Sequence, residues 1–367
     1  MFLVVAVATL TAQVPADSAS QPDARRGVTL IAATVPRTPK VLLIFDMEGI
    51  SGIDDPAMVN YGTTSYERGR EALVADVNSV VDGLAAGGVT EIAVRDAHGS
   101  GVPGGQDFPS DRLDERAHLL VVGQPWWNQG HWDAVVLVGM HAGPGSGGFL
   151  PHEGTIGGGE RIFNGISLTE TDFHAMNAAD KAGIPVIFAS GDDVLHKRLA
   201  ETMPWVEYVE VKKTVTVTKS AAYGPQKVRT ALRDGATHAL TRLSEAKIVR
   251  LNTPVQVTFR AHPPLDLRLI VGMPGLDAKE DGTGTVSVNF IAPDFDSAYR
   301  GCGRFNFLGR WIATTALATE ALKGLPDYDD IVKRRGKADQ LFAQAWLREE
   351  AKRASGDASP RKPLSFP

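Results

Sequence analysis

Acidic and imidazole side chains follow three apolar segments in the first half of this sequence. The segments are residues 41–45, 91–94 and 134–138, and the side chains that follow them are Asp46 with Glu48, His98, and His141. Carboxylates and imidazoles without a thiolate are typical ligands of zinc, and also of manganese or cobalt, in hydrolytic sites. Because Cys302 is the only cysteine, an intrachain disulfide and a cysteine-rich zinc site are both excluded. The pattern indicates a metal site built from carboxylates and histidines.

The spacing of Asp46 and Glu48 suits metal binding. In extended backbone, side chains two residues apart leave the same face, so both carboxylates can approach one cation, or one of them can bridge two cations. Glu170, near the start of an expected helix, adds a fifth candidate ligand. Five ligands exceed the need of one tetrahedral zinc. Two ions that share a bridging aspartate would use all five, and would hold a hydroxide for attack on a carbonyl group.

Each of these residues also has an ordinary structural explanation. A single histidine at a strand end is more often a hydrogen-bonded structural residue than a ligand, and Asp-x-Glu-Gly can simply form a turn. An acidic residue at a helix start, such as Glu170, is favourable for the helix dipole alone. The coincidence of such residues at three expected strand ends is what favours a metal site.

The apolar segments must be strands if these side chains are to meet. Residues 41–45 form a continuous apolar run, as is typical of a strand buried on both faces, and residues 185–189 form a further one. Helices are expected at Ser65–Ala86 and Leu168–Ala182. Strands and helices in alternation predict an α/β fold with a mostly parallel sheet flanked by helices. The carboxyl ends of parallel strands meet at one edge of the sheet, where ligands bind.

The chain is expected to contain two folded regions and two flanking segments. Residues 40–204, completed by a helix at 296–322, are predicted to form a metal-binding catalytic α/β domain. Residues 205–295 are predicted to form a second, smaller α+β domain, because their apolar residues alternate in short segments. The tail, residues 326–367, is charged and ends in a Ser/Pro-rich stretch, so we expect it to be partly disordered.

The N-terminal residues indicate export. Residues 1–16 contain an apolar run of signal-peptide length and are predicted to be a signal peptide, although no Lys or Arg precedes Arg25; residues 17–39 are predicted to be a linker. The protein is therefore expected to be periplasmic or secreted, and cytoplasmic if this leader is not a signal peptide. No other apolar stretch approaches membrane length, so no membrane partner is expected for the mature form. A net charge of −5 and the lack of a basic stripe argue against nucleic acid as a partner.

Several short motifs resemble the DppA-type zinc D-aminopeptidase family. They are FDMEGISG at 45–52, YERGR at 66–70, VRDAH at 94–98, GMHA at 139–142, LTE at 168–170 and GDD at 191–193. The resemblance extends over roughly residues 40–322. Its specific part is the first motif followed, in the correct order, by the two downstream histidines.

This resemblance implies roles for individual residues. In the family the first-motif aspartate, Asp46 here, bridges two zinc ions. The other ligands that it implies are Glu48 with His98 for one ion, and His141 with Glu170 for the second. A histidine on the loop after the second metal-binding histidine acts near the scissile bond. His152 occupies that place, where it would hydrogen-bond a tetrahedral intermediate or carry a proton.

The resemblance also implies an assembly and an activity. The family has an α/β domain with a smaller one, and forms a ring-shaped homo-oligomer, a decamer whose active sites face an inner channel. Its activity is the removal of N-terminal D-amino acids, notably D-alanine, from short peptides. We therefore predict a metal-dependent aminopeptidase with two zinc ions per subunit and a zinc-activated water. The alternatives are a dinuclear metallohydrolase of other amides, such as L-aminoacyl or gamma-glutamyl peptides, and a non-catalytic exported peptide-binding protein.

The sequence departs from the family at two places near the expected site. Ile44 stands where the family often has a small hydroxyl residue, which affects the surroundings of the metal but removes no ligand. Pro151 and Glu153 flank His152 in place of small polar residues. We expect this second departure to change the selection of substrates.

Some further positions keep two explanations. Asp96 can orient His98 or cap the following turn. Asn164, before Gly165, can be a turn residue or a substrate-binding residue, and Asp192–Asp193 can bind the substrate amine or cap a turn. The remaining histidines are expected to be structural or exposed: His118, His131, His174, His196, His238 and His262.

Overall fold

The computed structural model describes residues 27–323, 325–333, 337, 340, 343–345 and 347–348. The expected signal peptide, the first part of the expected linker and the end of the tail lie outside these residues. The chain separates into two compact units, Met1–Gly309 and Arg310–Pro367. Apart from the part of the last long helix that follows Gly309, the elements and residues discussed below lie in the first unit. No helix among the described residues is both long enough and apolar enough to cross a membrane.

A seven-stranded sheet is the centre of the first unit, in the order β10-β9-β8-β5-β2-β3-β4. Its strands are β2 (Lys40–Phe45), β3 (Glu91–Asp96), β4 (Ala117–Leu119), β5 (Ala134–Met140), β8 (Val186–Asp192), β9 (Glu207–Thr216) and β10 (Lys219–Ala222). Neighbouring strands are parallel except for β9 and β10. The expected mostly parallel sheet is confirmed.

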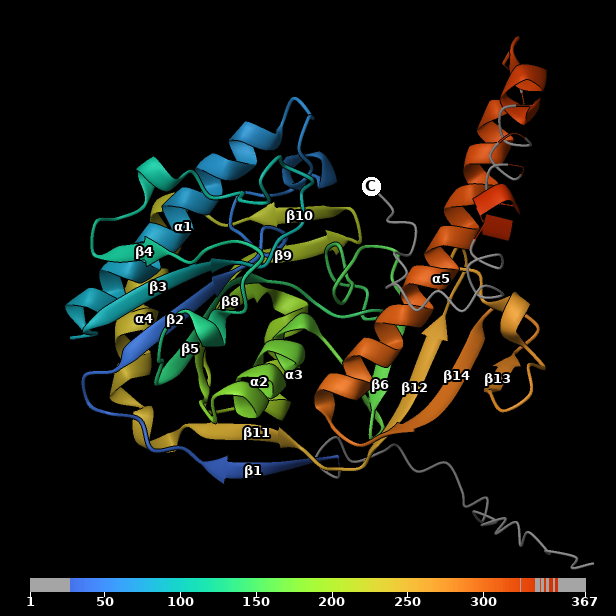
Figure 1. The fold of residues 1–367 in the computed structure, drawn as a ribbon. Helices are drawn as coiled ribbons and strands as arrows, with labels where there is room; N and C mark the ends of the chain where they lie inside the picture. The colour runs from blue at the N-terminus through green and yellow to red at the C-terminus, as the bar shows by residue number, and fades with distance from the viewer. Residues whose placement is uncertain are drawn as a thin grey trace, which may run out of the picture. The chain divides into compact units, whose positions relative to one another are not determined.

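Helices cover both faces of this sheet (Figure 1). They are α1 (Tyr66–Ala86), α2 (Glu170–Lys181), α3 (Asp193–Thr202) and α4 (Pro225–Thr241). Helices α1 and α4 pack against each other on one face, and α2 and α3 lie on the other. This division follows from right-handed connections between parallel strands. Along the sheet, the chain moves in one direction from β2 to β3 and in the opposite direction from β5 to β8 and β9. The helices within these connections therefore lie on opposite faces of the sheet.

Local sequence explains why these elements form where they do. The central strands β2 and β5 are almost entirely buried, as expected for apolar strands covered on both faces. Helix α1 buries an apolar stripe that includes Leu73, Val77 and Leu84. It ends at Gly87, and Gly88 follows with a φ of 90°, a conformation that favours glycine.

A second, five-stranded antiparallel sheet has the order β13-β14-β12-β6-β7. Its strands are β6 (Glu160–Phe163), β7 (Ile166–Ser167), β12 (Val255–Ala261), β13 (Asp277–Glu280) and β14 (Val286–Ala292). The long helix α5 (Phe295–Leu322) follows it and buries Phe295, Ala298 and Cys302. The short 3₁₀ helices are η1 (Pro56–Val59), η2 (Ser110–Arg112), η3 (Trp126–Asn128), η4 (Leu243–Glu245) and η5 (Arg268–Ile270).

The two sheets do not divide the chain at residues 204 and 205, where the sequence suggests a boundary. Strands β9 and β10 extend the large sheet, and β6 and β7, from the middle of the expected catalytic domain, belong to the small sheet. Sequence alternation shows that a segment is a strand but does not show which sheet it joins.

The folded part also begins earlier than Lys40. Strand β1 (Val28–Ala32) lies within the expected linker and pairs in antiparallel fashion with β11 (Lys247–Leu251). Most of β1 is only partly buried or exposed, and this explains why its sequence lacks the signal of a core strand.

Candidate metal centre

The candidate ligands gather at a point where the direction of the sheet connections reverses. Strand β2 lies between β3 and β5 in the sheet. The chain passes from β2 to β3 on one side, and from β5 it continues to β8 and β9 on the other side. A crevice at such a switch point, beyond the carboxyl ends of the strands, is the usual ligand site of an α/β sheet. Asp46 follows β2, His98 follows β3 and His141 follows β5. The carboxyl ends of these three neighbouring strands therefore meet at one edge of the sheet, as the sequence predicts.

Asp46 lies between two histidines and turns a different oxygen toward each. Its Oδ1 is 2.9 Å from Nδ1 of His98, and its Oδ2 is 3.2 Å from Nε2 of His141. The same Nδ1 of His98 is 3.0 Å from Oε2 of Glu48. On the other side, Nε2 of His141 is 3.5 Å from Oε2 of Glu170. The structure thus brings all five candidate ligands together in two groups that share Asp46.

His152 lies beside this cluster. Its ring stacks on that of His141, with centroids 4.1 Å apart and planes 14° from parallel. Its Nε2 is 4.0 Å from Oε1 of Glu48. Ligand atoms of His141, His152 and Glu170 lie close enough to one another to surround one ion, as do those of Asp46, Glu48 and His141.

Three histidines of the cluster, listed below, each place one ring nitrogen against a backbone carbonyl oxygen. The other ring nitrogen is then the one that can bind a metal ion or a substrate. Nε2 of His98 is 2.8 Å from the oxygen of Val59. Nδ1 of His141 is 3.0 Å from the oxygen of Ala142, and Nδ1 of His152 is 2.8 Å from that of Leu150. A carbonyl can only accept, so in the neutral rings the opposite nitrogen carries the lone pair. This is the arrangement that holds metal-binding histidines in position.

The donor set fits a zinc centre. Asp46 and Glu48 are each only 2% exposed, and His141 is fully buried. Oε2 of Glu48 and Nε2 of His141 are buried and make no hydrogen bond within the described part of the chain. Buried carboxylates without such bonds are costly unless positive charge compensates them. Bound cations between these atoms would supply that charge.

The histidines and carboxylates shift one another's pKa values. Burial alone lowers the pKa of the His98 imidazole, but the carboxylates of Glu48 and Asp46 raise it well above its usual value. His141 behaves in the same way beside Asp46 and Glu170. Burial raises the pKa of Glu170, but the neighbouring histidines reverse this and bring it to about 2. The Glu170 carboxylate is therefore ionised over the whole physiological range.

Close backbone contacts hold the loop that carries Asp46 and Glu48. The N–H of Gly49 donates to the oxygen of Gly139 at 2.8 Å, and a Cβ at Gly49 would overlap the backbone of Gly139 and Met140. Only glycine allows this approach of the β2 and β5 ends. Asp76 of α1 accepts hydrogen bonds from both the N–H and the hydroxyl of Ser51.

Lys212 of β9 fixes the same loop from another side. Its ammonium group is fully buried and donates to the backbone oxygens of Glu48 and Ile53. It also lies over the ring of Phe149, 4.6 Å from the centroid. Burial lowers the pKa of Lys212 to about 7. No carboxylate of the described residues accepts a hydrogen bond from Lys212, which is unusual for a buried lysine. Its bonds therefore serve to hold the backbone of the loop that carries Glu48.

Glu170 is held by the start of α2. Thr169 and Asp172 form a reciprocal capping box around this residue. Four residues along the helix, Nε2 of His174 is 3.6 Å from Oε1 of Glu170. His174 is buried, and neither ring nitrogen makes a hydrogen bond within the described part of the chain. His174 is expected from the sequence to be structural or exposed, but its i, i+4 spacing from Glu170 is a sequence signal for this contact.

The structure favours structural explanations for the residues left open. Asp96 accepts from the N–H groups of His98 and Asp107, and so caps the turn. Asp192 accepts from Val194 and Leu195 at the start of α3, and from the N–H of Ala142 beside His141.

Asn164 occupies the turn between β6 and β7 with a positive φ of 50°. Its side-chain amide bonds to the backbone of Gly27, Asn252 and Gln256, and these are the contacts of a turn residue. Its amide oxygen and nitrogen are therefore both occupied by the fold.

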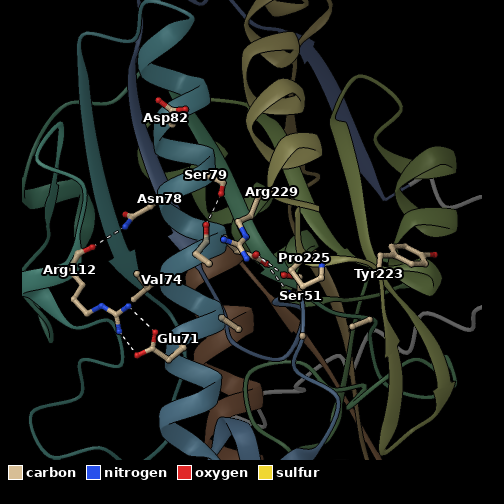
Figure 2. A pocket seen from close by; sticks show the side chains of 15 residues that line it. Ser51, Glu71, Val74, Asn78, Ser79, Asp82, Arg112, Tyr223, Pro225 and Arg229 are labelled. Carbon is tan, nitrogen blue, oxygen red and sulfur yellow. Dashed lines mark hydrogen bonds and ion pairs between the residues drawn. The ribbon is translucent and has the colours of Figure 1, made fainter. Parts of the chain in front are cut away.

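A separate cleft of about 680 Å³ lies between α1 and α4 (Figure 2). Its lining includes Ser51, Asp76, Tyr223 and Arg229, and none of the five candidate ligands. Ser51 and Asp76 connect it to the back of the metal-binding loop. The cleft is therefore distinct from the site at the strand ends.

Each of three comparisons with known proteins found a D-aminopeptidase. The family model Peptidase_M55, described as D-aminopeptidase, matches residues 40–302. A D-aminopeptidase of Bacillus subtilis (strain 168) is 27% identical over 268 residues, which are 71% of this chain and 94% of that protein. A solved structure, the Zn-dependent D-aminopeptidase DppA from Bacillus subtilis, described as a self-compartmentalizing protease, is similar with a TM-score of 0.63 and 25% identity. That similarity covers 74% of this chain and 98% of the other. The residues matched by the family model include the five candidate ligands and His152.

Proposed function

The chain belongs to the Peptidase_M55 family of D-aminopeptidases, and from this membership we propose that it is a metal-dependent hydrolase that releases N-terminal D-amino acids, such as D-alanine, from short peptides. The family model and the Bacillus subtilis sequence and structure support the activity. The observation that carries the proposal is the position of Asp46 between His98 and His141, with one carboxylate oxygen toward each ring.

This position supports a pair of zinc ions in each subunit. Asp46 would bridge them, since its two oxygens face two separate ligand groups. The remaining ligands are Glu48 with His98 on one side, and His141 with Glu170 on the other. Manganese and cobalt accept the same donor types. When bound, zinc would polarise the scissile carbonyl and lower the pKa of a water molecule.

His152 is the group of the protein that we assign to proton transfer. Its hydrogen bond to Leu150 leaves Nε2 as the nitrogen that faces the cluster. Burial and the neighbouring His141 lower the pKa of His152, so the ring is neutral at neutral pH. A neutral imidazole can take up a proton at Nε2 and deliver it to the leaving amine. Its place beside His141 keeps it near the bond that is cleaved.

We also propose a homo-oligomer, a ring-shaped decamer that admits short peptides to enclosed active sites. The support is the description of the Bacillus subtilis structure as self-compartmentalizing. Export to the periplasm or the exterior is a further proposal, supported by the apolar run within residues 1–16. Mass spectrometry of the mature N-terminus tests export, because a retained Met1 in the native host would contradict it.

The activity is tested with matched D- and L-aminoacyl amides and dipeptides. We expect D-Ala-D-Ala to be hydrolysed faster than L-Ala-L-Ala, chelation to abolish turnover, and zinc to restore it. A preference for L-aminoacyl or gamma-glutamyl substrates would instead favour a metallohydrolase of other amides. Activity that chelation leaves unchanged would rule out the metal, and purified protein without zinc, manganese or turnover would indicate a binding protein.

A further inference from the structure

Glu153, the residue after His152, is held by two groups from the small sheet and its helix. It is 1% exposed, although it is a glutamate in a loop. Arg161 of β6 forms an ion pair with Oε2 of Glu153 and also donates to its backbone oxygen at 2.9 Å. Tyr299 of α5 donates its hydroxyl to Oε1 at 2.9 Å. Both carboxylate oxygens of Glu153 are therefore occupied.

The network extends to the helix that carries Glu170. The ring of Tyr299 packs on that of Phe173, with centroids 4.4 Å apart, and Phe173 lies in the first turn of α2. The guanidinium group of Arg161 also lies over the ring of Tyr299, 4.7 Å from its centroid. Tyr299 thus connects the loop of His152 with the start of α2, and so with a candidate metal ligand.

The loop is held in part by its own backbone, because the N–H of Thr155 donates to the oxygen of Glu153 at 3.0 Å and that of Gly158 to the oxygen of Thr155 at 2.8 Å. After Glu153 it contains Gly154, Gly157, Gly158 and Gly159. Glycine has more backbone freedom than any other residue, so this segment needs external contacts to hold one conformation. The space around Gly154 is limited by Arg161 and by the hydroxyl of Tyr299, which would both lie close to an added Cβ. The network therefore adds to the contacts that set the position of the loop.

We propose that Glu153, Arg161 and Tyr299 are positioning residues that hold His152 against the metal centre, so that the small sheet and α5 brace the catalytic loop. This inference rests on the proposed function in one respect, the role of His152. A buried ion pair contributes little net stability, and its best-supported use is to specify one arrangement. Here the arrangement is the stacking of His152 on His141 and the approach of its Nε2 to Glu48.

Tyr299→Phe tests the network with the smallest change. It removes only the hydroxyl, while Arg161 still compensates the charge of Glu153 and the ring still packs on Phe173. Displacement of a catalytic group by about 1 Å can lower a rate about 100-fold. Because the variant loses only one of the contacts that hold the loop, we expect a smaller fall in kcat, of about 10-fold, while the zinc content and KM stay unchanged. Tyr223→Phe is the matched control, since Tyr223 also donates to a glutamate, Glu210, but lies at the cleft between α1 and α4.

A double-mutant cycle separates positioning from general damage. If Tyr299 acts through His152, Tyr299→Phe should change kcat by less than about 2-fold when His152→Ala is already present. An equal loss of kcat with and without His152 would overturn the proposal, as would an unchanged kcat in the single variant.

A measurement without substrate keeps the test independent of the proposed activity. Hydrogen–deuterium exchange of the metal-free protein should be faster in the peptide that covers residues 150–159 for Tyr299→Phe, and unchanged for Tyr223→Phe. If the wild type fails to hydrolyse peptides, the proposed function fails, and this exchange comparison still decides whether the network holds the loop. Identical exchange in Tyr299→Phe and the wild type would overturn it.

Discussion

The rings of His141 and His152 lie face to face, with their centroids 4.1 Å apart, yet their surroundings shift the pKa values of the two imidazoles in opposite directions. The carboxylates of Asp46 and Glu170 outweigh burial and raise the pKa of His141. Burial and the charge of His141 lower the pKa of His152. Two stacked imidazoles are thereby given different properties, one suited to a ligand close to carboxylates and the other to a neutral base.

His152→Ala should separate catalysis from metal binding. Because general acid–base groups contribute about 10²–10⁴-fold, we expect kcat to fall in that range while zinc content stays at the wild-type value. His141→Ala is the comparison, since it should lower zinc content itself. Metal analysis and steady-state kinetics of both variants measure this. Loss of zinc from His152→Ala would show that His152 is a ligand.

The sequence was sufficient for the central strands of the large sheet because they are apolar on both faces, but it assigned the residues of β9 and β10 to the smaller domain. It was also sufficient to bring Asp46, His98 and His141 to one edge, since the carboxyl ends of parallel strands must meet there. The contact of Lys212 with the loop of Glu48 was not predictable, because it joins residues 164 apart in the chain. A lysine in an alternating segment gives no sign of its burial. The sequence marks Glu153 only as a departure from the family. Its contacts with Arg161 and Tyr299 follow from the fold, because these residues belong to β6 and α5.

Zinc uptake should release protons. The raised pKa values of His98 and His141 mean that both rings carry protons near neutral pH before metal binds. Zinc must displace these protons, so its apparent affinity should fall as the pH is lowered from about 8 to about 6. Isothermal titration calorimetry in two buffers with different ionisation enthalpies measures the release. A binding enthalpy that does not depend on the buffer would contradict it.

Lys212→Met should weaken zinc binding without destabilising the metal-free protein at neutral pH. The variant loses the hydrogen bonds to Glu48 and Ile53, but it no longer buries an ammonium group, and such replacements are often neutral or stabilising. Zinc titration and denaturant unfolding of metal-free protein measure the two effects.

The pH dependence of stability gives a second check on Lys212. Its folded-state pKa of about 7 lies below the ordinary value of 10.5, so between these values the unfolded chain binds more protons. The free energy of unfolding should therefore rise with pH in this window, by at most about 1.4 kcal/mol per unit from this group. Lys212→Met should lack this contribution. Identical slopes in the two proteins would show that the lysine is not buried as described.

The shared position of Asp46 predicts a graded loss of metal among ligand variants. Asp46→Ala removes the carboxylate that faces both ligand groups, so we expect it to retain neither zinc tightly. Glu170→Gln affects only the group around His141 and should retain about one zinc per subunit, because the other ligands remain complete. Glu201→Gln, at an exposed position of α3, is the control and should bind like the wild type. Metal content after exhaustive dialysis measures the series. Equal zinc content in Asp46→Ala and Glu170→Gln would mean that Asp46 does not bridge two ions, and the two-ion arrangement would have to be replaced by a single site.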